Sequence, residues 1–132
     1  MKPYALIIED DATLLEIFSQ AIQAAGYQTS SIRQGEDGLA ALKHETPNLI
    51  VLDLHLPNVS GITILNYIRS EDRLASTWVI ITSADTLMTD DLRKNDGVDF
   101  VMEKPVSFIQ LSNLAARLHP NNQPKGRVTM EK

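Results

Sequence analysis

The chain alternates short apolar runs with segments whose hydrophobic residues repeat at helical spacing, and this alternation restricts the fold more than any other feature. Three apolar runs, at residues 4–8, 48–52 and 78–81, are almost unbroken by polar side chains. Such runs are typical of central parallel strands, because helices cover both of their faces. A more polar segment at 28–32 predicts an edge strand, and residues 100–102 predict a short fifth strand.

Helical patterns separate and follow these strands. The first ends at Gly26, a residue that commonly closes a helix, and its inward positions are Leu14, Ile17, Phe18, Ala21 and Ala25. Four more helices are expected at about 36–45, 60–70, 86–95 and 108–118. The fourth has few apolar residues, so we expect it to pack weakly and to be a mobile element.

Five strands that alternate with five helices predict an α/β fold with a parallel sheet and right-handed crossovers. The polar second strand suits an edge and the most apolar strands suit the middle. We therefore predict a flavodoxin-like (βα)5 three-layer sandwich with strand order 2-1-3-4-5. The sequence predicts one domain over residues 1–119. The segment 120–132 is polar and rich in Pro, Asn and Lys, which predicts a disordered tail.

Composition excludes several classes of function. The net charge is −5 and the basic residues are scattered, which argues against binding to nucleic acid. Cysteine is absent, so disulfides and thiolate metal sites are excluded. No apolar stretch is long enough to cross a membrane, and because the first predicted strand begins at residue 4, we expect no signal peptide. We therefore expect a soluble, cytoplasmic protein.

Three consecutive acids, Glu9, Asp10 and Asp11, follow the first strand. One of them, Asp11, is expected to cap the next helix. Capping explains one acid at such a position but not three. Crowded carboxylates repel one another, and a bound cation relieves that repulsion. Because all the ligands would be oxygens, the motif favours a hard ion such as Mg²⁺.

A further acid, Asp53, follows the apolar run at 48–52, which is the third predicted strand. It has a simple structural interpretation, as a residue that ends a buried strand and helps a turn. In the predicted strand order, however, the first and third strands are neighbours about 4.8 Å apart. Asp53 would then lie beside Glu9 and Asp10, as a nucleophilic carboxylate next to a metal ion. A carboxylate in that position can attack a phosphoryl group and form an acyl phosphate.

Two further polar pairs end the fourth and fifth strands. Thr82-Ser83 by itself is more typical of a helix cap or turn, and Lys104 by itself of a solvated lysine. Together with Asp53 they supply a hydroxyl donor and a positive charge, which a bound phosphoryl group needs. Pro105 permits a cis peptide bond that would aim Lys104 inward.

With these motifs in order, residues 4–119 resemble the receiver (CheY-like) domain of two-component response regulators. The resemblance implies that Asp53 is the phosphoacceptor. It implies that Glu9 and Asp10 hold Mg²⁺, with Asp53 and the backbone carbonyl of His55 as further ligands. Any one motif is weak evidence, but four motifs in order at the family's spacing are specific.

The same resemblance implies that Thr82 is the switch hydroxyl, that Lys104 contacts the phosphoryl group, and that small Ser83 leaves access to Asp53. It implies a histidine kinase or histidine phosphotransfer protein as phosphoryl donor. It implies no enzyme activity beyond self-catalysed phosphoryl transfer to Asp53 and slow dephosphorylation. Output would pass through the face of the fourth helix, fifth strand and fifth helix, to an unknown protein partner or to a second copy of the chain in a homodimer.

One position departs from the family pattern. Receivers commonly carry Tyr or Phe three residues before the lysine, where this chain has Val101. Phe100 is one residue away and should face the other side of the sheet. The departure leaves open a second hypothesis, a receiver-like binding module that works without phosphorylation. A third, a metal-dependent phosphatase, is disfavoured because Asp53-Leu54-His55 lacks the second acid of the Asp-x-Asp motif.

Overall fold

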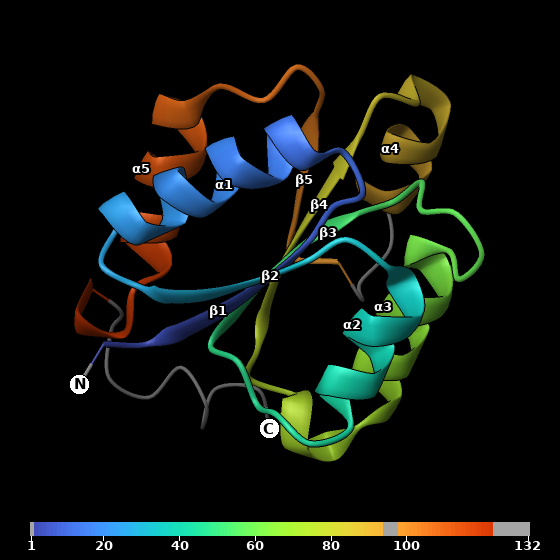
Figure 1. Ribbon diagram of the computed structural model, residues 1–132, viewed down its shortest axis with the longest axis horizontal. Coiled ribbons are helices and arrows are strands. Elements are labelled where there is room, and N and C mark those ends of the chain that lie inside the picture. Colours follow the sequence, from blue (N-terminus) through green and yellow to red (C-terminus); the bar gives the residue numbers. More distant parts are fainter. Residues whose placement is uncertain (1, 94–97, 123–132) are drawn as a thin grey trace.

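The computed structural model describes residues 2–93 and 98–122, which form a five-stranded parallel sheet between helices (Figure 1). The strand order is β2-β1-β3-β4-β5, so the predicted fold class and order are confirmed. The strands are β1 Tyr4–Ile8, β2 Gln28–Ile32, β3 Leu49–Asp53, β4 Trp78–Ser83 and β5 Phe100–Glu103. The fully buried strand β3 lies in the centre, and the polar strand β2 lies at one edge.

Helices cover both faces of the sheet. They are α1 Ala12–Ala24, α2 Gly35–Leu42, α3 Gly61–Ser70, α4 Thr86–Arg93 and α5 Phe108–Leu118, with 3-10 turns at Asp72–Leu74 and Pro120–Asn122. In Figure 1, α1 and α5 lie together on one face, while α2 and α3 lie on the other. A separate hydrophobic cluster fills each interface, and the side chains of each central strand point alternately into one cluster and the other.

Local chemistry explains where the first helix begins and ends and where the third helix begins. Asp11 caps α1, because its side chain accepts a hydrogen bond from the backbone N–H of Leu14 at 2.9 Å. Gly26 follows α1 with a φ of 97°, a conformation that glycine adopts without a steric penalty. Ser60 caps α3 in the same way as Asp11 caps α1, through the N–H of Thr63 at 3.2 Å.

The second helix is shorter than the predicted range of 36–45, since α2 ends at Leu42. The guanidinium of Arg73 donates to the carbonyl of Leu42 and, at 2.8 Å, to that of Glu45. These carbonyls at the end of α2 are therefore satisfied by a side chain rather than by another helical turn. A contact with a residue so distant in sequence leaves no local signal in residues 36–45.

The end of the chain also differs in part from the prediction. Residues 120–122, expected to begin the disordered tail, form a 3-10 turn, and the side-chain amide of Asn122 donates to the carbonyl of Ala116 at 2.7 Å. Residues 123–132 lie outside the described part, as do residues 94–97, which include the predicted end of the fourth helix. Within the described residues, the structure has no helix of the length and hydrophobicity needed to cross a membrane.

Candidate functional site

Strand alternation places four of the predicted site residues on the same side of the sheet. Each lies two positions beyond a residue of the hydrophobic cluster beneath α1 and α5. The pairs are Ile7 and Glu9, Val51 and Asp53, Ile80 and Thr82, and Met102 and Lys104. Because the strands are parallel, all four residues also lie at the same edge. The sheet therefore gathers them from four strand ends at one place.

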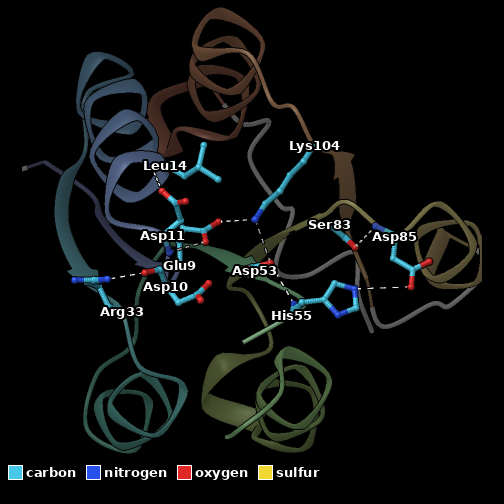
Figure 2. Close-up of polar contacts among 10 residues, drawn as sticks. All are labelled: Glu9, Asp10, Asp11, Leu14, Arg33, Asp53, His55, Ser83, Asp85 and Lys104. Carbon is cyan, nitrogen blue, oxygen red and sulfur yellow. Dashed lines mark hydrogen bonds and ion pairs between the residues drawn. The ribbon is translucent and has the colours of Figure 1, made fainter. Parts of the chain in front are cut away.

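Lys104 is the centre of the ionic contacts at this edge. Its Nζ lies 2.8 Å from Oε1 of Glu9 and 3.4 Å from Oδ1 of Asp53 (Figure 2). Glu9 and Asp53 are only 1% and 3% exposed, so both carboxylates are shielded from water. The peptide bond between Lys104 and Pro105 is cis, as the sequence permitted. The lysine thus points inward and holds two buried acids together.

Glu9, Asp10 and Asp53 form a cluster of three carboxylates. Each offers one oxygen, and these oxygens all lie within 4.8 Å of one another. The cluster carries more negative charge than Lys104 alone neutralises, and its donors are oxygens only. These properties fit a hard divalent cation such as Mg²⁺. Asp11, in contrast, is used as the cap of α1, so the three-acid motif divides into two cluster members and one capping residue.

The environment shifts the pKa of each member of the ion-paired group. Burial raises the pKa of the Asp53 carboxyl, although the Lys104 charge and the backbone N–H of His55, 3.2 Å from Oδ1, oppose the shift. Burial likewise raises the pKa of Glu9, against opposing bonds from Lys104 and the Asp11 backbone. For Lys104 burial acts to lower the pKa, but the two carboxylates outweigh it and the pKa is raised. The lysine therefore stays charged while its partners resist ionisation.

Two buried side-chain oxygens at this edge have no hydrogen-bond partner among the described residues, Oε1 of Glu9 and Oγ1 of Thr82. The first is ion-paired with Lys104, whereas the hydroxyl of Thr82 has no such contact. Strand β4 continues through Ser83, so Thr82 lies within the strand, in register with Asp53 on β3. Its side chain is fully buried, and Oγ1 has no hydrogen-bond partner among the described residues. A buried hydroxyl without a partner is costly, and it is accounted for if the site receives a group with acceptor oxygens.

Ser83 and His55 have different positions. The hydroxyl of Ser83 accepts a hydrogen bond from the backbone N–H of Asp85 at 3.0 Å, so this side chain braces the loop after β4. The imidazole of His55 is exposed and lies 3.9 Å from the Asp85 carboxylate, outside the acidic cluster (Figure 2). Its backbone N–H, but not its ring, contacts Asp53. The backbone carbonyl of His55 as a metal ligand stays a prediction.

Two residues that contribute to this edge were given no role from the sequence. At Gly61, an added Cβ would lie 2.5 Å from the carbonyl oxygen of Asp53, so the start of α3 can approach the end of β3 only without a side chain. The helical range at 60–70 was visible, but this close approach was not. Arg33 donates from Nε to the backbone oxygen of Asp10 at 3.1 Å. The signal available for it was its place directly after the second strand, whose end adjoins that of the first.

Val101 occupies the position where the family commonly has an aromatic residue, and the structure shows which face it takes. Val101 packs with the cluster beneath α2, α3 and α4, whereas Phe100 packs with the opposite cluster. The ring of Phe100 lies against Trp78 at a centroid distance of 5.9 Å. The prediction that Phe100 faces the other side is confirmed, and Phe100 does not replace the missing aromatic side chain.

Comparison with a family model and with known proteins gives a consistent result. Residues 5–116 match the model described as the response regulator receiver domain. The polar-differentiation response regulator DivK of Brucella anthropi is 31% identical over 108 residues, which cover 81% of this chain and 88% of that protein. The DivK of Brucella ovis is 30% identical over the same shares of both chains.

Solved structures agree with the sequence comparison. The receiver domain of a Francisella response regulator has a TM-score of 0.78 and 25% identity, and the match covers 92% of this chain and 99% of that one. The BeF3-activated receiver domain of DrrB, a Thermotoga maritima protein, has a TM-score of 0.77 and 27% identity, covering 89% of this chain and 97% of that one.

Proposed function

Since the chain belongs to the response regulator receiver domain family, we propose that Asp53 accepts a phosphoryl group, with Mg²⁺, and that the phosphorylated protein changes its binding to a partner. The donor is a histidine kinase or a histidine phosphotransfer protein. Receiver domains are signalling domains, and the catalysis proposed here is confined to the protein's own phosphorylation and slow dephosphorylation. A cytoplasmic location, which the family implies, belongs to the same proposal.

The contact set around Lys104 is the observation that carries this proposal. An ammonium that meets both Asp53 and Glu9, beside a fully buried Thr82 hydroxyl without a partner among the described residues, suits a phosphoryl group attached to Asp53. A purely structural ion pair would account for Lys104 and the acids. It would not account for the unpartnered hydroxyl next to them.

In the proposed reaction a carboxylate oxygen of Asp53 attacks the phosphorus of a phosphohistidine. The new P–O bond forms while the P–N bond breaks, and its electron pair goes to the leaving imidazole. Lys104 stays protonated and neutralises charge on the transferred group. Glu9, Asp10 and Asp53, with the His55 carbonyl, would hold Mg²⁺. The ion, when bound, supplies further positive charge to the phosphoryl oxygens.

After transfer, the phosphoryl oxygens offer acceptors that the Thr82 hydroxyl lacks. Donation from Thr82 would favour an arrangement of the β4–α4 loop that differs from the present one, and so shift the populations of the α4–β5–α5 face. This face is the proposed output surface. A second copy of the chain or a different protein can occupy it, and size-exclusion chromatography with and without phosphorylation distinguishes a homodimer from the monomer.

Incubation with acetyl phosphate and Mg²⁺, followed by intact mass spectrometry, tests the proposal. The native chain should gain the mass of one phosphoryl group, and Asp53→Asn should gain none. Asp10→Asn is a second variant, since it keeps the acceptor but removes a cluster carboxylate, and it should require more Mg²⁺. Equal phosphorylation of native protein and Asp53→Asn, or none of the native protein, would refute the assignment.

Val101 motivates a second candidate function, a binding module that needs no phosphorylation. An aromatic switch residue is absent at this position, so a coupling between site and output face that depends on it is absent too. This candidate predicts partner binding that is unchanged in Asp53→Asn. A pull-down with native protein and Asp53→Asn, each with and without acetyl phosphate, separates the two functions. If the first function is right, phosphorylating conditions change partner binding of the native protein and not of the variant. If the second is right, the two proteins bind the partner equally under both conditions.

A further inference from the structure

The backbone of the acidic loop 9–11 is tied down at several points. The N–H of Glu9 donates to the carbonyl of Ile32 at 3.0 Å, which extends the pairing of β1 with β2. The N–H of Asp11 donates to Oε2 of Glu9 at 3.1 Å. The cap on Leu14 then joins Asp11 to α1. The loop is therefore a fixed turn between strand and helix.

Asp10 differs from the other two cluster carboxylates in how its side chain is held. Glu9 and Asp53 are each in contact with Lys104, and each also accepts a backbone N–H. Among the described residues, the carboxylate of Asp10 has neither a hydrogen bond nor an ion pair, and it is partly exposed. The position of its oxygens consequently depends on where the backbone places Asp10 and on the side-chain rotamer, with no polar contact among the described residues to hold them.

Arg33 supports that backbone. It follows β2 directly, and because Ile32 pairs with Ile8, its side chain starts beside the acidic loop. Its Nε donates to the backbone oxygen of Asp10 at 3.1 Å, and Arg33 makes no other hydrogen bond to the described residues. Figure 2 shows it approaching Asp10 from the side away from Lys104. The guanidinium thus contacts the backbone of a cluster member rather than its carboxylate.

We propose that Arg33 is a positioning residue for the cation site, because its hydrogen bond to the Asp10 carbonyl holds the backbone that carries a carboxylate without polar contacts of its own in the described structure. The proposal rests on the proposed function, since it presupposes that the cluster binds Mg²⁺. It assigns Arg33 no contact with the ion or with the phosphoryl group. A ligand whose supporting contacts are lost generally binds its metal more weakly.

The charge of Arg33 acts in the opposite direction to its hydrogen bond. A positive group near a cation site repels the cation, so removal of the charge alone should tighten Mg²⁺ binding. Loss of the hydrogen bond should weaken it. The two contributions can be separated because glutamine and methionine have the length of arginine up to its Nε, and both are uncharged. Gln carries an N–H donor at that point in the chain, and Met carries a methyl group.

The experiment is a calorimetric titration of the full chain with Mg²⁺ alone, without a phosphoryl donor, for the native protein, Arg33→Gln and Arg33→Met. We expect Arg33→Met to bind Mg²⁺ about 3- to 10-fold more weakly than Arg33→Gln, as for one lost hydrogen bond. Equal affinity of the two variants, or tighter binding by Arg33→Met, would overturn the proposal. Thermal unfolding without Mg²⁺ controls for folding and should give the same midpoint for both.

A kinetic readout separates positioning from a general loss of activity. With acetyl phosphate, the Mg²⁺ concentration that gives half-maximal phosphorylation should rise in Arg33→Met relative to Arg33→Gln, while the rate at saturating Mg²⁺ stays equal. A lower saturating rate in Arg33→Met would contradict positioning. Failure of the native chain to bind Mg²⁺ would overturn the proposed function as well, whereas failure of the Gln–Met difference alone leaves that function intact.

Discussion

The two halves of the site differ in whether their buried polar side chains have polar partners. On the β1–β3 side, Glu9 and Asp53 both contact Lys104 and accept backbone hydrogen bonds, and the loop after β1 is anchored to β2 and α1. On the β4 side, the hydroxyl of Thr82 is buried without a partner in the described residues. The helix that follows β4 also exposes 79% of Leu87 to solvent.

This difference suggests a division of labour within one sheet edge. Binding a cation and a phosphoryl group requires ligands that are in place beforehand, which the β1–β3 side provides. A response requires a group whose best partner is absent until phosphorylation, and Thr82 meets this requirement. The fixed half would therefore determine affinity and rate, and the incompletely satisfied half would determine the conformational response. Each prediction below perturbs one half and measures the property assigned to that half or its effect on stability.

The largest effect is expected from Lys104→Met, which removes the only ammonium in contact with the two acids in the described structure and keeps an apolar stem of similar length. Phosphorylation by acetyl phosphate should slow about 100-fold, as for other lost electrostatic contacts to a transferring group. Two shielded carboxylates would also lose their counter-charge, which should cost roughly 3 kcal/mol of unfolding free energy at neutral pH.

Lys43→Met is the matched control for that variant, since Lys43 is an exposed residue in the turn after α2. Its phosphorylation rate and its urea unfolding curve should match those of the native protein. A native-like rate and stability in Lys104→Met would show that the fixed half does not depend on this ion pair, and the comparison between the halves would fail.

Asp53→Asn should have a smaller effect on stability than Lys104→Met, and of opposite sign, since it should stabilise the protein when Mg²⁺ is absent. The pKa of Asp53 is raised in the fold above the ordinary value of 3.8, mainly by burial, so the native state binds its proton more tightly than the unfolded chain does. The stability that this carboxyl contributes is therefore complete below pH 3.8 and is lost as the pH rises through the folded pKa. The asparagine side chain does not titrate, so the variant does not lose this stability as the pH rises.

Urea unfolding at pH 5 and pH 8 measures this difference. At pH 8 the unfolding free energy of the variant should exceed that of the native protein by on the order of 1–2 kcal/mol. At pH 5 the difference should be equal or smaller. Mg²⁺ should stabilise the native protein more than the variant and so reduce the gap. An asparagine variant that is less stable than the native protein at pH 8 without Mg²⁺ would contradict the raised pKa.

The sequence was sufficient for the fold because the signals of the central strands are local. The runs that became β1, β3 and β4 are apolar for four or more residues, and the polar run of β2 correctly indicated an edge. With the order known, the meeting of Glu9 with Asp53 follows from adjacent parallel strands. The spatial proximity of the predicted acids was therefore within reach of pattern and geometry alone.

The features that sequence patterns missed depend on contacts between distant residues. The early end of α2 depends on Arg73, and the support of Asp10 depends on Arg33 reaching a carbonyl at the end of the neighbouring strand. The absence of a partner for the Thr82 hydroxyl is likewise a property of its surroundings, not of its residue type. Such features become visible only when side chains are placed in space.

Thr82 provides the smallest expected change in stability and the most direct test of the comparison. Val has nearly the shape of Thr but lacks the hydroxyl, so Thr82→Val removes a buried polar group that has no partner in the described structure. The unphosphorylated protein should be as stable as the native chain or up to about 1 kcal/mol more stable. Thr82→Ser keeps the hydroxyl and serves as its control.

The decisive measurement is amide hydrogen exchange of residues 86–93 before and after phosphorylation. In the native chain and in Thr82→Ser, phosphorylation should change the exchange of this helix, because the hydroxyl gains an acceptor. In Thr82→Val the phosphoryl group should still be accepted by Asp53, but the change in α4 should be reduced. If the exchange of α4 changes as much in Thr82→Val as in the native chain, the β4 side responds to phosphorylation through contacts other than this hydroxyl. The lack of a partner for the Thr82 hydroxyl in the unphosphorylated protein would then have no role in the switch.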